Sequence, residues 1–533
     1  MRVEKEKIKL KDFSFISNLV TDYSENNHKL KSFVTDFPNE KSIIKKIKNR
    51  KFSSSLRSDL VKVLKKQYSN TFFYNSNLEL VNKNINKISL SDTYTITTGH
   101  QLCLFSNPLF LIYKIIDVIN LSKKISKISN KNIIPIFWLA SEDHDFDEIK
   151  EFNLHENKYV WNKKTSNKQV GLIKTKQIKV FINNIFQSIE DGPNKKDLKK
   201  ILTETYSQNI NLSFATRSLL TFFFAKHGLV VLDSNDSILK KHFKSIIKKD
   251  IIENISHKFV SSQTKKISKF YNPVVKPRNI NFFYLKNEKR IRIFYDKNKY
   301  RLVDSSKSWT EKEIVNEIEI NPEKFSPNVI LRTLFQEKIL PNIVYIGGPS
   351  EISYWLQFKT LFSNLKVSFP ILINRSFILN IDRDHIKFLH KNRIKIIDLI
   401  SPLDGFLYKS LYKKATINLN NEVSDFTKIL KSVMRKSKKV DNSLDVHVLA
   451  QGKKIEKILL NVERKIIKNQ KKNYVEFLKQ LSNIHSHVYN NNIIQERRLT
   501  FLYYYLKYGN KFFDILFKKL DCLEKEYIIL KGL

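Results

Sequence analysis

The sequence predicts an α/β protein built on a parallel sheet. Residues 93–98 (TYTITT) alternate and are β-branched, residues 109–125 carry apolar side chains at helical spacing, and residues 133–140 (IIPIFWLA) form a continuous apolar run. A strand, a helix and a strand within about 50 residues form a βαβ unit, which implies parallel strands. Residues 342–362 (NIVYIGGPSEISYWLQFKTLF) repeat the plan of strand, glycine turn and helix.

The other segments follow from their periodicity. Residues 1–90 have helical spacing, and residues 228–236 (GLVVLDSND) and 367–376 (VSFPILINRS) are typical of buried strands. After about residue 420, apolar residues at three- and four-residue steps predict a long helix pair or short coiled coil, although a helical hairpin packed on the core fits equally well. We therefore expect N-terminal helices with the first half of the core (1–155), a first insertion (156–225), a core strand and helix (226–245), a second insertion (246–320), the second half of the core (321–420), coiled-coil helices (421–490) and a helical C-terminal tail (491–533).

Composition limits the classes of function. The 533 residues carry a formal net charge of +43, which invites a nucleic-acid interpretation. Lysine, asparagine and isoleucine abound and the lysines are scattered, as an AT-rich coding sequence would produce, so we do not expect a nucleic-acid partner. Anionic substrates are still attracted by such a charge.

The sequence shows no pattern typical of a membrane helix, a secretory signal or a cysteine framework. No apolar run reaches the roughly 18 residues of a membrane helix, and the start lacks the apolar region of a secretory signal. The two cysteines form neither a metal-type spacing nor a disulfide framework. We expect a cytoplasmic protein that does not associate with membranes.

Three polar or glycine-rich turns follow predicted strands. They are residues 98–101 (TGHQ), 141–145 (SEDHD) and 347–351 (GGPSE). Ligands of open parallel sheets bind beyond the carboxyl ends of the strands. The sequence therefore predicts that these turns converge on one ligand-binding crevice.

The acidic turn concentrates ionisable groups. Glu142, Asp143, His144 and Asp145 are adjacent, and such crowding raises at least one carboxyl pKa unless a cation or a hydrogen-bond donor compensates. The turn suits a general base that deprotonates an amine, a Mg²⁺ ligand, or a site for an ammonium group. The alternative is a solvated acidic turn in which Asp145 or Asp147 caps a helix.

The other two turns suit anions. His100 and Gln101 can donate hydrogen bonds to phosphate or carboxylate oxygens, and backbone amides at Gly347 and Gly348 lie near a helix start. A simple strand-to-helix turn explains TGHQ equally well, and neither a G-x-x-x-x-G-K-[ST] loop nor a G-x-G-x-x-G fingerprint occurs.

Two arginines complete the candidates. Arg332, on a helical stretch, and Arg375, at the end of a strand, could each bind a substrate carboxylate or serve in a structural ion pair. The candidate catalytic residues are His100, Asp143, His144 and Asp145. The candidate substrate-binding residues are Gln101, Lys114, Trp138, Glu142, Arg332, Gly347, Gly348, Glu351, Tyr354, Gln357 and Arg375. No residue is assigned to a metal.

Four long motifs resemble a known family. They are TGHQLCLFSNPLFLIYKI (98–115), PIFWLASEDHDFDEI (135–149), NVILRTLFQEKILPNIVYIGGPSEISYWLQFK (328–359) and QERRLTFLYYYLKYGNKFFDIL (495–516). Their order and spacing over nearly the whole chain resemble the cysteine-adding enzyme family of bacillithiol biosynthesis. His100 stands where the family more often has Gln, which puts a fixed catalytic role for that position in doubt.

The resemblance implies both an architecture and a reaction. It implies a Rossmann-like core with connective-peptide-like insertions, and a C-terminal coiled coil used in homodimers. It implies a ligase that adds L-cysteine to glucosaminyl-malate through an amide bond, in the last step of bacillithiol biosynthesis. We expect ATP or another nucleotide to activate the cysteine carboxyl, with Mg²⁺ as an optional companion. The competing interpretations are a synthetase-like protein associated with tRNA and a scaffold with a degenerate site.

Overall fold

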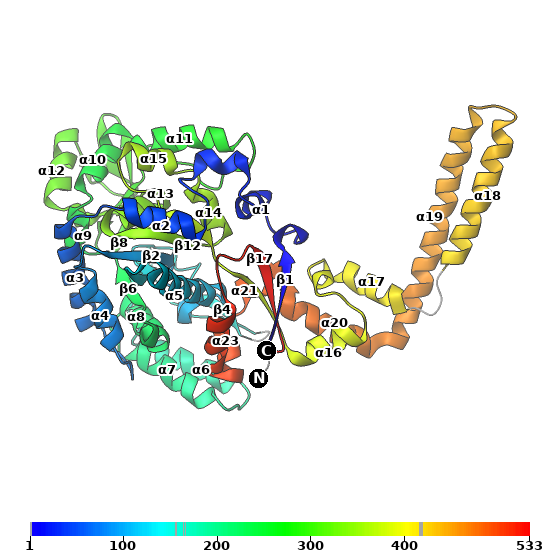
Figure 1. Cartoon of the computed structure of the whole chain (residues 1–533), viewed down its shortest axis with the longest axis horizontal. Coiled ribbons are helices and arrows are strands. Elements are labelled where there is room, and N and C mark those ends of the chain that lie inside the picture. Colours follow the sequence, from blue (N-terminus) through cyan, green and yellow to red (C-terminus); the bar gives the residue numbers. More distant parts are fainter. Residues whose placement is uncertain (1–2, 155–156, 164, 166, 415–418) are drawn as a thin grey trace. The chain divides into compact units, whose positions relative to one another are not determined.

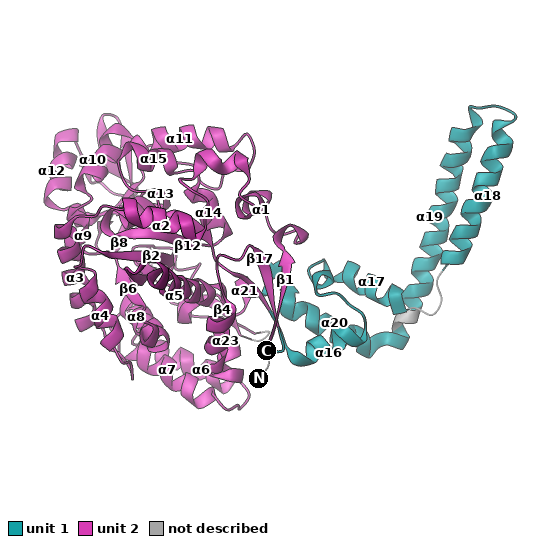
Figure 2. Cartoon of the chain, in the orientation of Figure 1, with its two compact units in different colours: residues 1–2, 380–495, 531–533 teal, residues 3–379, 496–530 magenta. Residues whose placement is uncertain are grey.

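The computed structural model describes residues 3–154, 157–163, 165, 167–414 and 419–533, which divide into two compact units (Figures 1 and 2). Unit 2 contains residues 3–379 and 496–530, and unit 1 contains residues 380–495 and 531–533. The expected boundary between residues 155 and 156 lies outside the described residues, as do residues 415–418 near the expected end of the core.

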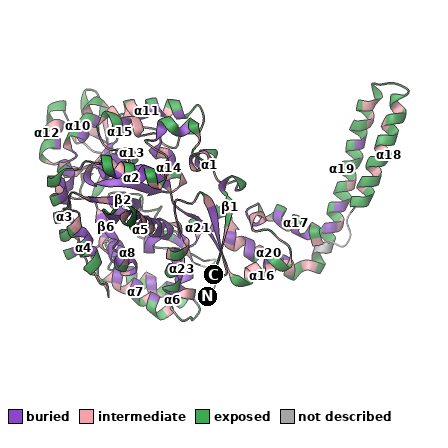
Figure 3. Cartoon of the chain, in the orientation of Figure 1, coloured by how far each residue is buried: buried purple, intermediate pink, exposed green. Residues whose placement is uncertain are grey.

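A five-stranded parallel sheet forms the centre of unit 2, in the order β13-β12-β2-β3-β6. The expected α/β fold with a parallel sheet is confirmed. The strands are almost completely buried (Figure 3), which explains why their sequences are apolar or β-branched rather than alternating with charges. The strands are β2 (Thr93–His100), β3 (Asn132–Leu139), β6 (Val230–Asp233), β12 (Asn342–Gly347) and β13 (Ile371–Asn374).

Helix α5 (Phe110–Ser129) is the crossover between β2 and β3. Its apolar residues occur around most of its circumference, so it is buried over most of its length and brings Lys114 and Asp117 into the interior. It ends at Asn130, whose φ of 52° is left-handed, a conformation that asparagine tolerates.

Helices surround the central sheet of unit 2 (Figure 1). Besides α5, they are α1 (Asn18–Ser24), α2 (Glu40–Asn49), α3 (Ser54–Ser69), α4 (Glu79–Lys87), α6 (Ile178–Gln187), α7 (Lys195–Ser207), α8 (Leu212–Phe224), α9 (Ser237–Lys241), α10 (Lys244–Glu253), α11 (Ile255–Ile267), α12 (Glu311–Ile320), α13 (Val329–Ile339), α14 (Pro349–Trp355), α15 (Lys359–Asn364), α22 (Phe501–Tyr508) and α23 (Lys511–Lys519). The short α21 (Gln495–Arg498) lies where the chain re-enters unit 2.

A second, antiparallel sheet has the order β10-β9-β8-β7-β11. Asn287 and Glu288, which join β7 to β8, both have positive φ, as a two-residue type I′ hairpin turn requires. The alternation of residues 281–304 (NFFYLKNEKRIRIFYDKNKYRLVD) around their turns is typical of such hairpins. The strands are β7 (Phe282–Lys286), β8 (Lys289–Asp296), β9 (Lys299–Leu302), β10 (Ser308–Trp309) and β11 (Phe325–Pro327).

The remaining strands form small sheets. β4 (Glu151–Leu154) pairs with β5 (Asn157–Val160), and β1 (Glu4–Lys9), β17 (Glu526–Lys531) and β14 (Phe377–Ile381) form a sheet in the order β1-β17-β14. The tail that was expected to be helical therefore ends in a strand, because its last apolar residues, 527–530, are buried in this sheet.

Unit 1 is mainly helical. It contains α16 (Arg383–Lys391), α17 (Leu403–Lys414), α18 (Asn420–Lys438), α19 (Leu444–Gln470), α20 (Val475–Val488) and the hairpin of β15 (Tyr489–Asn490) and β16 (Ile493–Ile494). Helices α18 and α19 lie side by side (Figure 1), and a Cβ at Gly452 would collide with the Leu430 side chain. Apolar side chains on this helix pair, Val446 among them, are exposed. No helix of the described chain is long and apolar enough to cross a membrane.

A buried ion pair joins the last segment of unit 2 to the end of β13. Arg375 Nη1 and Nη2 lie 2.8 and 2.6 Å from the two carboxylate oxygens of Glu496, and both residues are fully buried. The Arg375 guanidinium also packs on the rings of Phe110 and Phe377. This bidentate pair connects segments that lie 121 residues apart in the sequence.

We predict that Glu496→Gln lowers the free energy of unfolding by about 3–5 kcal/mol, because it leaves the Arg375 charge buried without a counter-ion. The double variant Arg375→Met/Glu496→Leu should regain much of that loss, since it buries no charge. Urea denaturation measures both. A Glu496→Gln variant as stable as the unaltered protein would contradict the prediction.

Candidate functional site

A cavity of about 390 Å³ opens at the carboxyl ends of β2, β3 and β12, within the range of small-molecule sites. Its lining includes the ends of the TGHQ and SEDHD turns and the helix that follows the GGPSE turn. The predicted convergence of these segments on one crevice is therefore observed. Of the candidate residues, the cavity is lined by His100, Gln101, Trp138, Glu142, Asp143, Arg332, Glu351 and Tyr354.

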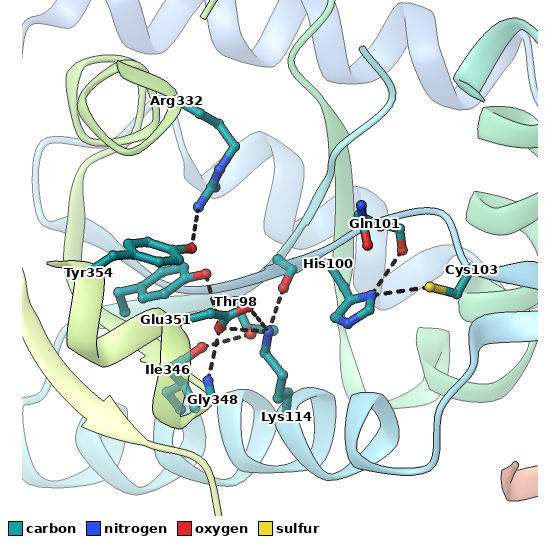
Figure 4. Close-up of polar contacts among 12 residues, drawn as sticks. Thr98, His100, Gln101, Cys103, Lys114, Arg332, Ile346, Gly348, Glu351 and Tyr354 are labelled. Atoms are coloured by element: carbon teal, nitrogen blue, oxygen red, sulfur yellow. Dashed lines mark hydrogen bonds and ion pairs between the residues drawn. The ribbon is translucent and has the colours of Figure 1, made fainter. Parts of the chain in front are cut away.

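The Lys114–Glu351 ion pair supports one wall of this cavity (Figure 4). Lys114 Nζ is fully buried, lies 2.9 Å from both carboxylate oxygens of Glu351, and donates a 2.5 Å hydrogen bond to Gly99 O. Burial opposes ionisation of Glu351, but the charge of Lys114 outweighs it and holds the pKa of the carboxyl below its ordinary value. Lys114 therefore acts from behind the cavity wall, by fixing Glu351 against the end of β2.

His100 presents a neutral imidazole. Burial and, secondly, the charge of Lys114 lower the pKa of His100 to about 4. His100 Nδ1 lies 3.1 Å from Gln101 O, and because a carbonyl oxygen only accepts, Nδ1 carries the proton and Nε2 the lone pair. Cys103 Sγ is 3.7 Å from the same Nδ1 and is buried. At neutral pH, His100 offers a hydrogen-bond acceptor and no positive charge for a phosphate.

Asp143 is held in its ionised form. Burial opposes ionisation, but hydrogen bonds from His144 and Gln101 and the charge of Arg290 outweigh it, so the pKa of Asp143 is well below its ordinary value. Gln101 Nε2 donates to Asp143 Oδ2 at 3.0 Å and the backbone N–H of His144 donates to Oδ1 at 2.8 Å. A carboxylate of such low basicity orients an amine or binds an ammonium group better than it removes a proton.

The other residues of the acidic turn have separate surroundings. Glu142 pairs with the buried Lys240, and the hydroxyl of Ser141 donates to Asp233 Oδ1 at 2.5 Å. Asp145 is exposed and accepts a long hydrogen bond from the backbone N–H of Glu148. It caps no helix, because the next element along the described chain is strand β4. At Asp143, hydrogen-bond donors and the charge of Arg290 prevent the raised carboxyl pKa that crowding alone would produce.

Arg332 differs from the other charged residues of the cavity. Its Nη2 donates to the Tyr354 hydroxyl at 3.4 Å and its Nη1 to Gln336 Oε1 at 3.3 Å, and the ion pairs of the described residues do not include it. Burial opposes its charge, but the tyrosines and Glu351 raise its pKa further, and burial raises the pKa of Tyr354 to about 12. Arg332 is thus a permanent cation that lacks a carboxylate partner in the described residues and is suited to an anionic ligand.

Several candidates lie outside the cavity lining. Gln357 is fully buried, where its side chain accepts from the backbone N–H groups of Val274 and Val275. Gly348 N donates to Glu351 Oε2 at 2.9 Å, so this amide is not open to an anion. A Cβ on Gly347 would come within 3.0 Å of the same oxygen, so glycine leaves room for the carboxylate.

Arg375 and His144 are also engaged elsewhere. Arg375 is occupied by Glu496, which is the structural alternative that its strand-end position left open. His144 lies beside the lining and packs on the ring of Phe283. Neither residue lines the cavity.

The cavity is also lined by residues that are not among the candidates, Arg290 and Asn328 among them. Arg290 comes from the hairpin of the second sheet, and Asn328 caps α13 by accepting hydrogen bonds from Ile330 N and Leu331 N. An asparagine before an apolar helical run is a recognisable capping signal. Arg290 has no such signal, because its position depends on how a separate sheet packs on the core.

The donor set does not fit a magnesium ion held by the protein. Each lining carboxylate is bound by a lysine or an arginine, and the described residues contain no group of three His, Cys, Asp or Glu that could hold a metal. A nucleotide would find one uncompensated lining cation, Arg332, in this part of the chain.

Sequence comparison identifies the family. Residues 1–376 match the model described as "Bacillithiol biosynthesis BshC, N-terminal Rossmann-like domain", and residues 378–532 match that described as "Bacillithiol biosynthesis BshC, C-terminal coiled-coil domain". A protein of Flavobacterium johnsoniae is 36% identical over 525 residues, and one of Christiangramia forsetii is 34% identical over 527 residues, each covering 97% of both chains. Both are named "Putative cysteine ligase BshC".

A solved structure from Campylobacter jejuni, titled as a putative arginyl t-RNA synthetase, covers 88% of this chain and 99% of its own at 10% identity. Its TM-score of 0.22 is too low to support an argument. The two family models cover almost the whole sequence, and full-length relatives exceed 30% identity. The chain therefore belongs to the bacillithiol biosynthesis BshC family.

Proposed function

We propose that the chain is a cysteine ligase that joins the carboxyl group of L-cysteine to the amine of glucosaminyl-malate, in the last step of bacillithiol biosynthesis. The proposal rests on two residues that line the same cavity. Arg332 is a cation without an ionic partner in the described residues, and Asp143 is an ionised hydrogen-bond acceptor. The names of the full-length relatives support the same reaction class.

Amide formation requires an activated carboxyl group. A free carboxylate is a poor acyl donor, so we propose that ATP or another nucleotide first activates the cysteine carboxylate. A carboxylate oxygen attacks the γ-phosphorus and displaces the nucleoside diphosphate to give an acyl-phosphate, or attacks the α-phosphorus and displaces pyrophosphate to give an acyl-adenylate. The amine nitrogen then attacks the acyl carbon, the phosphate or AMP leaves with the electron pair of the broken C–O bond, and the nitrogen loses one proton.

The charge of each lining residue determines the role that we assign to it in this reaction. Arg332 binds a malate carboxylate, because it is the lining cation without an ionic partner in the described chain. Asp143 orients the amine, and the unprotonated Nε2 of His100 is available as an acceptor. His100 and Asp143 are both weak bases, so we assign the final proton loss to solvent that reaches the open cavity.

The oligomeric state and the cellular location of the enzyme are part of the same proposal. We propose a homodimer formed through α18 and α19, because apolar side chains on these helices, such as Val433 and Val446, are exposed in the single chain. We also propose that the enzyme acts in the cytoplasm. A tRNA-associated role is not favoured, since the matched family models describe bacillithiol biosynthesis over nearly the whole chain.

The direct test supplies purified protein with cysteine, glucosaminyl-malate and ATP and detects bacillithiol by mass spectrometry. Asp143→Asn should lower kcat about 100-fold or more, because an amide cannot hold the amine as an anion does. Asp147→Asn is the control, since Asp147 is exposed in the same turn. Unchanged turnover of Asp143→Asn would remove the acidic turn from the mechanism.

Arg332→Gln should raise the KM for glucosaminyl-malate about 10- to 100-fold, through loss of a charge-assisted hydrogen bond, and leave the KM for cysteine unchanged. Lys338→Gln makes the same change of charge on helix α13, outside the cavity lining, and should have no such effect. Steady-state kinetics with each substrate varied in turn measures both. A rise confined to the KM of the nucleotide would instead assign Arg332 to phosphate.

The depressed pKa of His100 predicts a pH-dependent stability. Between the ordinary value of 6.5 and about 4, the unfolded chain binds a proton at His100 that the folded chain does not. The free energy of unfolding therefore falls as pH falls through this window, and His100→Gln should lose this contribution. Urea denaturation at several pH values tests this against His28→Gln, a change at an exposed histidine. Identical pH dependence of the His100→Gln and unaltered proteins would contradict it.

A further inference from the structure

We infer that Arg290, at the start of strand β8, is a positioning residue that holds the turn of Asp143 in its reactive geometry. The residue belongs to the antiparallel sheet, yet its side chain lines the cavity at the edge of the parallel sheet. The inference rests on the proposed function for its kinetic consequences, while its structural basis is independent of that function.

All three nitrogens of the Arg290 guanidinium have acceptors close by. Nε donates to Ser326 Oγ at 3.0 Å and Nη2 to Pro327 O at 2.7 Å, both on strand β11, which pairs with the far side of β7. Nη1 lies 3.5 Å from Asp143 Oδ1 and 3.4 Å from His144 Nδ1. The group therefore spans β11 and the acidic turn as a planar bridge.

Packing fixes the plane of this bridge. The guanidinium carbon of Arg290 lies 4.1 Å from the centroid of the Phe283 ring, and the arginine side chain is only 10% exposed. The same Phe283 ring packs against His144. A stacked and buried arginine has few alternative rotamers, so the position of its Nη1 is set by the hairpin and not by a ligand.

The tip of the hairpin supports the acidic turn by a second route. Glu288 O accepts a hydrogen bond from Gln169 N at 2.9 Å. The next two residues of that loop, Val170 and Gly171, donate backbone hydrogen bonds to Asp143 O at 2.6 Å and Ser141 O at 2.9 Å. The backbone of the acidic turn is thus bound by a loop that is hydrogen-bonded to the hairpin, and the Asp143 side chain is bound by Arg290.

The two arginines of the cavity differ in how many of their hydrogen-bond donors are already bound to protein groups. Arg332 has no carboxylate partner in the described residues, whereas Arg290 is committed to one carboxylate, one hydroxyl and one carbonyl. Substrate binding by Arg290 would require breaking these contacts. Its position at the cavity wall is better explained by its effect on Asp143.

Lysine cannot replace this arrangement. An ammonium group is a point charge that could remain near Asp143, but it cannot reach Ser326, Pro327 and Asp143 together as a fork does. Arg290→Lys therefore keeps the positive charge near Asp143 and removes the planar set of hydrogen bonds. Arg290→Gln removes both, and Arg292→Gln is the matched control because Arg292 lies two residues along the same strand and is exposed.

We expect Arg290→Gln to lower kcat about 10- to 100-fold, with KM for both substrates changing less than about threefold, because a small displacement of the reacting groups is costly. Arg290→Lys should also lose kcat, because a point charge near Asp143 cannot bridge the three acceptors. Arg292→Gln should match the unaltered enzyme in every respect.

Hydrogen exchange measured by mass spectrometry provides a readout that needs no activity. Peptides covering residues 139–150 and 168–173 should exchange faster in Arg290→Gln than in Arg292→Gln, as the amides of His144, Val170 and Gly171 lose protection. Unchanged exchange, unchanged kcat, or a rise in KM alone would overturn the inference. Absence of product with the unaltered enzyme would overturn the proposed function instead, and the exchange result would still decide the role of Arg290.

Discussion

The buried ion pair between Lys114 and Glu351 is the constraint on which the site depends. It joins three elements: the crossover helix α5, the end of β2 through Gly99 O, and the first turn of α14, whose Glu351 is 237 residues from Lys114 in the sequence. A buried charge that loses its partner costs several kcal/mol, so these elements cannot separate cheaply. The cavity therefore has a preformed wall before any ligand binds.

Ion pairs between the lining carboxylates and nearby cations determine which ligand charges the cavity attracts. Glu351, Glu142 and Asp143 each have a lysine or arginine partner, and His100 is neutral, so the acidic turn does not make the cavity strongly negative. The remaining charge is that of Arg332. A site of this kind discriminates by the position of individual charges, since its local charge nearly balances while the whole chain is strongly basic.

The sequence could predict the parallel sheet and the convergence of the turns, because both follow from patterns within about 50 residues and from the direction of parallel strands. It could not predict that Arg375 is occupied by Glu496, or that Arg290 reaches Asp143. These contacts join segments 121 and 147 residues apart, and no local periodicity records such a pairing. Strand β17 was missed for a related reason, since a short apolar run becomes a strand only when partners exist.

The contrast between lysine and arginine separates composition from function. Lysine predominates across the surface, where a point charge is sufficient and an AT-rich coding sequence would supply it. Several arginines bind more than one acceptor with one planar group: Arg57 and Arg217, like Arg290 and Arg375, are largely buried and bond to two or more groups. The buried lysines of the site, Lys114 and Lys240, each bind one carboxylate and one backbone carbonyl, contacts that a point charge can make. Where several acceptors lie around one guanidinium, as at Arg290 and Arg375, geometry and not charge alone is required.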